Sequence, residues 1–204
     1  MRKAILITLG LIALAVLASA GTVIFLKNGA HGFSARANPS AFEVTLARTA
    51  RSLALPAGAR DRTNPVPRTQ EALDEGMAHW ADHCAVCHGN DGAGQVDMGK
   101  QMYPHAPDMR KAETQNLTDG ELFYIIENGI RLSGMPAWGG SRAAGQSSWK
   151  LVNFIRHLPK LSDDEIKRME KLNPKSPDDI EREQAEEQFL NGQTPNEVPA
   201  QHHH

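Results

Sequence analysis

Residues 84–88 read Cys84-Ala85-Val86-Cys87-His88, and this pentapeptide decides how the whole chain is interpreted. The two cysteines are the only ones in the sequence, and Cys87 follows Cys84 by three residues, about one helical turn. Such a pair can form half of a zinc site, with His83 or His88 assisting, but a zinc ribbon usually supplies a second Cys or His pair at related spacing. A thioredoxin-like redox pair would need a βαβ context, and the chain shows little strand pattern.

The C-x-x-C-H spacing instead favours covalent attachment of c-type haem. Two thiols on one helical turn can add to the two vinyl groups of one porphyrin, and the imidazole of the adjacent His88 then reaches the iron from the same side. We therefore expect one covalent haem c, attached through Cys84 and Cys87, with His88 as an axial ligand. Covalent attachment keeps the haem bound in an oxidising compartment, where no reservoir exists to replace it.

Residues 69–160, which surround this motif, resemble a class I c-type cytochrome domain. Gly76 and Trp80 precede the first cysteine by eight and four residues, and in that family a small and an aromatic residue at these offsets meet the C-terminal helix. The stretch 148–158, with an apolar face at helical spacing, is the partner expected here. The resemblance implies an all-α fold, the class I cytochrome c fold, with helices packed around one haem.

The string Gly134-Met135-Pro136-Ala137-Trp138 resembles the distal-ligand loop of the same family. It implies Met135 as the sixth ligand of the iron, 47 residues beyond His88. A thioether is a soft, weak donor that favours ferrous iron, so His/Met ligation raises the reduction potential. Weaker alternatives are four other histidines, of which the first two are expected to face solvent: His79, His83, His105 and His157. Four other methionines are expected to fill the core instead: Met77, Met98, Met102 and Met109.

The loop that follows the haem motif, residues 89–94, consists of turn-forming residues. In the family, a proline beyond this loop accepts the Nδ1 proton of the proximal histidine through its carbonyl, and this bond fixes the imidazole. Pro104 and Pro107 are both candidates, and the sequence does not decide between them. Thr118 and Glu121 have capping-box spacing and predict the start of a helix.

The N-terminal residues 4–26 form an uncharged apolar run. As a helix it would span roughly 34 Å, enough to cross a bilayer core of about 30 Å. The preceding Arg2 and Lys3 favour a cytoplasmic N-terminus, which would put everything after Lys27 on the periplasmic or extracytoplasmic side. A cleaved signal peptide is the competing interpretation, because residues 18–20 have small side chains typical of a cleavage site. The length of the run favours an uncleaved transmembrane anchor.

The charge distribution divides the 204 residues into segments. Residues 1–68 carry nine Lys/Arg and two Asp/Glu, residues 69–160 eight and eleven, and residues 161–204 five and eleven, which together give the net charge of −2. A chain this close to neutral is not expected to bind nucleic acid. Four parts are expected: an anchor or signal peptide over 1–27, an Ala/Pro/Arg-rich tether over 28–68, the haem domain over 69–160, and an acidic extension, mostly helical or disordered, over 161–204.

These features predict a membrane-anchored one-electron carrier rather than an enzyme, because with both axial positions filled no site remains open for oxygen or substrate. Its expected partners are redox proteins in or at the membrane. The distal loop and the tether also resemble cytochrome modules of respiratory and dehydrogenase complexes, including the cytochrome subunit of cbb3-type oxidases. The alternative function is therefore that of an electron-entry subunit in such a complex. A haem sensor or peroxidase ranks last, because no distal His/Arg pair stands at fixed spacing.

Overall fold

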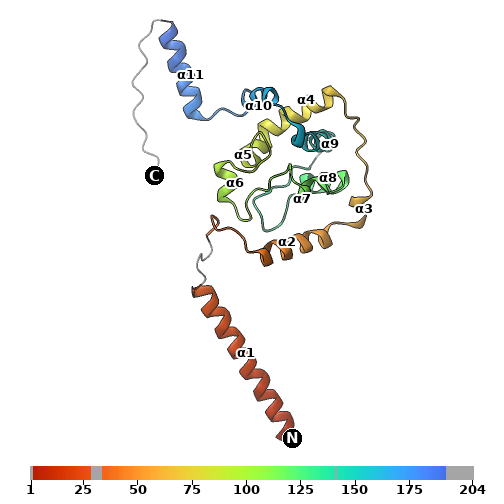
Figure 1. Ribbon diagram of the computed structural model, residues 1–204, viewed down its shortest axis with the longest axis vertical. Coiled ribbons are helices and arrows are strands. Elements are labelled where there is room, and N and C mark those ends of the chain that lie inside the picture. The colour runs from red at the N-terminus through yellow and green to blue at the C-terminus, as the bar shows by residue number, and fades with distance from the viewer. Residues whose placement is uncertain (1, 29–33, 141, 192–204) are drawn as a thin grey trace.

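The computed structural model describes residues 2–28, 34–140 and 142–191. All regular elements in these ranges are helical, which confirms the predicted all-α class (Figure 1). They are α1 (Arg2–Asn28), α2 (Ala41–Ala54), α3 (Ala57–Arg60), α4 (Gln70–His79), η1 (Trp80–Cys84), α5 (Ala85–His88), α6 (Asp97–Gln101), α7 (Ala112–Gln115), α8 (Asp119–Asn128), α9 (Arg142–His157), η2 (Leu158–Lys160), α10 (Asp163–Glu170) and α11 (Pro177–Leu190).

The crossing of α4 and α9 forms the centre of the core, as the sequence predicted. At Gly76 the two backbones approach so closely that an added Cβ would lie 2.5 Å from the carbonyl oxygen of Lys150. Trp80 and Phe154 are both almost completely buried, with ring centroids 5.7 Å apart. Only glycine permits this approach without displacing a helix, since any other residue would put its Cβ against backbone.

The segment before α4, residues 60–64, packs against α8 and α9. Arg60 Nε donates to Glu121 Oε1 at 2.9 Å, and Glu121 also completes the predicted capping box of α8. The guanidinium of Arg62 lies 4.4 Å from the centre of the Phe123 ring. Asn64 Nδ2 donates to the carbonyl oxygen of Trp149 at 3.0 Å. The second half of the expected tether is therefore part of the folded body.

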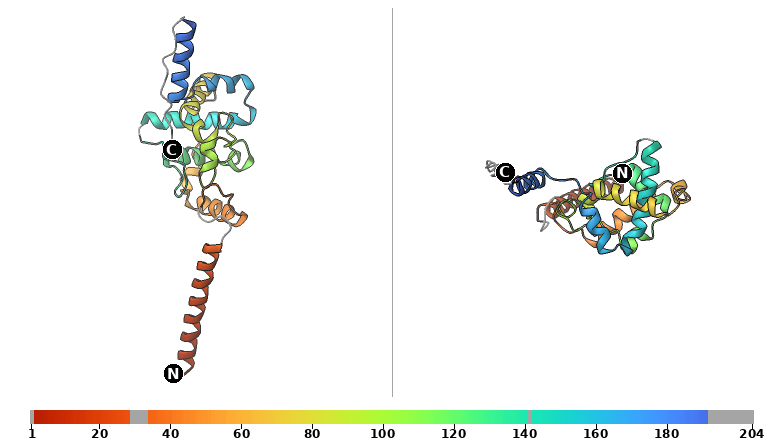
Figure 2. Two further views of the ribbon diagram at one scale, coloured as in Figure 1. Left: turned by 90° about the vertical axis from the view of Figure 1, so that its left-hand side faces the viewer. Right: turned by 90° about the horizontal axis from the view of Figure 1, so that it is seen from above.

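Beyond residue 160 the chain also returns to the core. Met169 of α10 is completely buried, and Arg168 makes an ion pair with Asp74 of α4 at 2.9 Å. His157 Nε2 lies 2.8 Å from Glu165 Oε1. By contrast, α11 projects away from the body (Figure 2), in keeping with its polar composition. Residues 192–204, expected to lack structure, lie outside the described residues.

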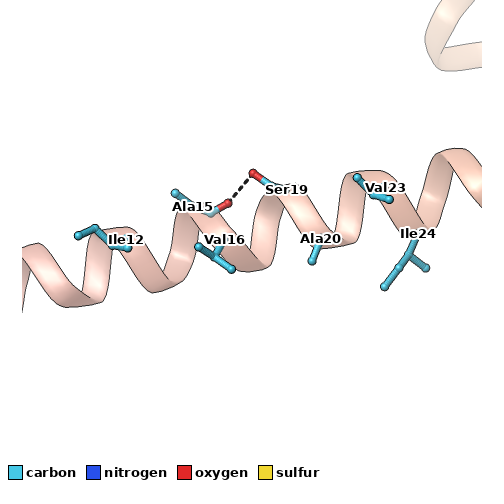
Figure 3. A pocket seen from close by; sticks show the side chains of 7 residues that line it. All are labelled: Ile12, Ala15, Val16, Ser19, Ala20, Val23 and Ile24. Carbon is cyan, nitrogen blue, oxygen red and sulfur yellow. Dashed lines mark hydrogen bonds between the residues drawn. The ribbon is translucent and has the colours of Figure 1, made fainter.

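The N-terminal helix α1 contains one span, Arg2–Phe25, that is long and apolar enough to cross a membrane. None of that span is buried against the rest of the protein. One face presents mostly Ile, Val and Ala side chains, and the hydroxyl of Ser19 donates back to the Ala15 carbonyl at 2.8 Å (Figure 3). Because this hydroxyl is satisfied within the helix, the face suits an apolar surrounding.

Candidate haem-attachment site

Cys84, Cys87 and His88 lie on one continuous helical run made of α4, η1 and α5. Residues Trp80–Cys84 form a π-turn, in which the Ala85 N–H bonds to the Trp80 carbonyl five residues earlier. Such turns are often found at functional sites, because they change the direction of the following side chains. Here the turn ends at Cys84, so it sets the direction of the first predicted attachment residue.

Both thiols are unpaired and partly accessible in the structure. Burial, and then the neighbouring Cys87, raises the pKa of Cys84 to about 12. Burial also raises the pKa of Cys87. Both cysteines are therefore present as thiols, about one helical turn apart and followed directly by an imidazole. This donor set fits the attachment of a haem c through two thioether bonds.

The competing interpretation of the cysteine pair is zinc coordination, and the described residues offer no cluster of further ligands for it. In the part of the chain that the structure describes, no three side chains among His, Cys, Asp and Glu converge as they would around a metal ion. The Nδ1 atom of His83 already has a partner, since it lies 2.8 Å from Asp82 Oδ2. The arrangement therefore favours haem attachment over a zinc half-site.

Trp80 packs beside His88 at this site. Its buried indole Nε1 donates to the Gly89 carbonyl at 3.0 Å, directly after the helix ends. The Trp80 and His88 rings lie 5.6 Å apart. Gly89 ends α5 with a φ of 74°, a conformation that favours glycine. The chain can therefore turn sharply after His88 while Trp80 supports the imidazole.

The loop after His88 folds back on the attachment helix through backbone hydrogen bonds. The N–H of Gly94 donates to the His88 carbonyl at 2.8 Å, and the N–H of Met109 donates to the Gly92 carbonyl at 2.8 Å. Gly99 packs against the Cys87 carbonyl so closely that a Cβ there would clash with it. Residues 89–109 thus form a compact wall beside the histidine.

Of the two candidate prolines, Pro107 is the one whose backbone carbonyl influences the pKa of His88. Burial lowers the pKa of His88, and the backbone carbonyl of Pro107 opposes that effect. His88 Nδ1 is buried and has no hydrogen-bond partner among the described residues. The structure thereby distinguishes between the two prolines that the sequence left open.

Met135 comes from a separate part of the fold, the loop after α8. Backbone bonds close this loop: the Ile130 N–H donates to the Met135 carbonyl at 3.1 Å, and the Trp138 N–H donates to the Ile126 carbonyl at 3.0 Å. Ser133 Oγ accepts from the Met135 N–H at 3.2 Å. These bonds hold the backbone on both sides of the methionine in one conformation.

A ring contact brings this loop to the attachment helix. The rings of Trp138 and His83 lie 5.3 Å apart, and His83 immediately precedes Cys84. His83 was expected to face solvent; its side chain is 39% exposed, and its ring also packs against Trp138 and lies 4.8 Å from the His79 ring. Sequence reasoning missed this link, since nothing local in the chain relates positions 83 and 138.

The remaining alternatives for an axial ligand differ in their surroundings. His157 is already bonded to Glu165. His105 lines a cleft of about 490 Å³ together with Arg36 and Lys100, and its Nε2 is buried without a partner.

Among the methionines expected in the core, Met77 is buried, but Met98 is 52% exposed, so that expectation is wrong for Met98. Met102 instead packs against Gly134, next to Met135.

A comparison with protein families matches residues 71–155 to the family described as cytochrome c oxidase, cbb3-type, subunit III. No curated protein matches the chain. The matched range contains the cysteine pair with its histidine, the wall beside them, and the Met135 loop. Residues 71–155 are therefore similar to the c-type cytochrome domain of cbb3-type oxidase subunit III, and this similarity suggests a haem c and a role in electron transfer.

Proposed function

We propose that the protein is a membrane-anchored monohaem cytochrome c that passes single electrons between redox partners at the outer face of a membrane. The observation that carries the proposal is the pair of unpaired thiols, Cys84 and Cys87, placed directly before His88 in a cytochrome-type domain. A haem c bound there supplies a one-electron ferric/ferrous couple. The protein would then perform no bond chemistry of its own.

We assign the axial positions to His88 and Met135. Trp80 lies beside the His88 ring, and the Pro107 carbonyl is the acceptor we assign to its Nδ1, which would leave Nε2 for the iron. The closed loop after α8 restrains Met135, and the contact of Trp138 with His83 holds that loop beside the attachment helix. A rigid ligand set limits the rearrangement that accompanies each electron transfer.

The membrane part of the proposal rests on α1. Its apolar span would cross the bilayer, and the two cations that precede the apolar run, Arg2 and Lys3, favour a cytoplasmic N-terminus. The haem domain would then face the periplasm or another extracytoplasmic compartment. Confinement to the membrane plane raises the effective concentration of partners in the same membrane.

A second function is favoured by the family match itself, which is to a subunit of an oxidase. In that case the chain would be the electron-entry subunit of a larger respiratory or dehydrogenase complex. The two functions differ in one observable property. A subunit should remain with other polypeptides through detergent extraction and native electrophoresis, whereas a free carrier should migrate alone.

The attachment of haem can be tested on the full chain produced with a haem-attachment system. We expect a c-type pyridine haemochrome, haem that survives acid–acetone extraction, and an intact mass increased by one haem. The variant with both Cys84→Ser and Cys87→Ser should release all haem into the acidic acetone. Absence of haem in the unmodified chain, or complete extraction from it, would refute the proposal.

A further inference from the structure

Helix α2 (Ala41–Ala54) carries three large apolar side chains on its outer surface. Phe42 is 74% exposed, Leu46 58% and Leu53 82%, and no residue of the helix is buried. The three are spaced four and seven residues apart, so they fall within about 40° of one another around the helix axis. We call Phe42, Leu46 and Leu53 the α2 stripe. A group of large apolar side chains on one exposed face typically marks a contact surface.

Polar contacts fix the rotation of α2 so that the α2 stripe faces outward. They join other sides of the helix to the haem domain and the segment that follows: Glu43 with Tyr103 at 2.8 Å, Arg48 with Glu113 at 3.7 Å, and Ser52 with Arg60 at 2.8 Å. The three α2 residues lie at least about 80° around the helix from the centre of the stripe. The stripe is thus a fixed feature of the folded surface rather than one face of a freely rotating helix.

The position of α2 in the chain bears on what covers the α2 stripe. Residues 29–40 separate the end of α1 from the start of α2, and 12 residues span at most roughly 40 Å. If α1 crosses a bilayer, α2 is therefore held close to its surface. Figures 1 and 2 show α2 along one edge of the body, with α4 on the opposite side. The edge that bears the α2 stripe is thus the one closest along the chain to the span.

The charge of this region suits a lipid headgroup layer. Residues 34–68 contain six Lys/Arg and two Asp/Glu, an excess of four positive charges. Helices that lie in the membrane interface combine an apolar face with surrounding basic residues, which are attracted to anionic lipids. The segment after α1 is basic overall, and three of its arginines, Arg48, Arg60 and Arg68, also pair with carboxylates of the haem domain.

We propose that α2 lies in the interface of the bilayer that α1 crosses, with the α2 stripe inserted among the acyl chains. This proposal rests on the proposed membrane anchor. Its consequence is that the haem domain is held at the membrane by two contacts, α1 and α2. The ties of α2 to Tyr103 and Glu113 would then fix which side of the domain faces the lipid.

Depth-dependent fluorescence quenching tests the proposal on the full, haem-loaded chain in nanodiscs of phosphatidylcholine and phosphatidylglycerol. One added cysteine would carry a bimane label at Leu46→Cys or Leu53→Cys, since the haem occupies the native thiols. Quenching by aqueous iodide is compared with quenching by lipids brominated on their acyl chains. Quenching at each position is expressed relative to the unquenched fluorescence of the same label, so the loss of fluorescence that the haem causes cancels.

Three control positions make the outcome specific. Ile12→Cys, within the span of α1, should respond to brominated lipid only, and Glu71→Cys, at an exposed position of α4, to iodide only. Ala47→Cys is the matched control, because it follows Leu46 but points about 100° away. We expect the stripe labels to be quenched by brominated lipid, with iodide quenching reduced several-fold relative to Ala47→Cys.

The possible failures are distinguishable. If Ile12→Cys responds to iodide, the membrane anchor itself is wrong. If Ile12→Cys responds to lipid while Leu46→Cys and Leu53→Cys respond only to iodide, the anchor stands and the interfacial position of α2 is refuted. Stripe labels protected from both quenchers would mean that a protein surface, such as a second copy of the chain, covers the stripe instead.

Discussion

The ring of His83 lies 5.3 Å from the ring of Trp138, and this contact joins the two halves of the haem site. His83 stands next to Cys84, and Trp138 stands three residues after Met135. The contact therefore fixes the methionine loop relative to the attachment helix. It would allow Met135, the proposed ligand in the loop after α8, to reach a haem attached through Cys84 and Cys87.

Loss of the Trp138 ring should weaken the hold on Met135. A contact between aromatic rings contributes about 1 kcal/mol, equal to about a five-fold change in an equilibrium. In Trp138→Leu we expect imidazole or cyanide to displace the methionine at about five-fold lower concentration, measured by optical titration of the ferric protein. Trp138→Phe retains a ring and should behave like the unmodified protein. Equal displacement in all three proteins would show that the contact does not position the loop.

Replacement of Met135 should remove the sixth ligand. In Met135→Ala we expect loss of the methionine–iron charge-transfer band and a lower reduction potential, because the soft thioether that favours ferrous iron is gone. Absorption spectroscopy and potentiometry measure both effects. Met98→Ala is the matched control, since Met98 is largely exposed and should change neither. Unchanged spectra in Met135→Ala would assign the ligand to another residue.

A methyl group at Gly76 should separate α4 from α9. The added Cβ would lie 2.5 Å from the Lys150 carbonyl oxygen and 3.1 Å from the Phe154 Cβ. Because overpacking of a core costs about 1–3 kcal/mol, we expect Gly76→Ala to lower the free energy of unfolding by about that amount in urea titrations. At Gly58 an added Cβ meets nothing within 4 Å, so Gly58→Ala should be no less stable than the unmodified protein. Equal stability of both variants would contradict the close crossing.

The stability should depend on pH through Glu165. Burial raises the pKa of Glu165, but hydrogen bonds from Ser162 and His157 outweigh it, so the pKa lies below 4.5 in the folded protein. A carboxyl group with a lowered folded-state pKa stabilises the protein above its unfolded-state pKa and loses this effect as the pH falls through the folded value. Glu165→Gln should therefore be less stable than the unmodified protein at neutral pH, and the difference should shrink in acid. A difference that stays constant across that range would refute the role of the charge.

Intact mass of the membrane form separates the two interpretations of α1. A retained anchor gives a species that includes residues 1–20. A species that begins at Gly21 would show that the segment is a cleaved signal peptide.

The site was predictable from sequence where its chemistry is local. Cys84, Cys87 and His88 lie within five residues of one another, and the resemblance to class I cytochromes implied the pairing of Gly76 with the last helix of the domain. Contacts between distant segments were not predictable, because no periodic pattern encodes them. The packing of Arg62 on Phe123 and the ring contact of His83 with Trp138 are of this kind. The burial of Met169, which belongs to the segment expected to be an acidic extension, depends on the same long-range packing.

The central claim is that the chain is a one-electron carrier whose haem iron has both axial positions filled by the protein. A potentiometric titration of the full, haem-loaded chain in nanodiscs, with and without carbon monoxide, tests it most directly. The account predicts a single one-electron transition that carbon monoxide does not shift. A shifted transition would contradict the account by showing an open axial position, and a second transition would contradict the single haem.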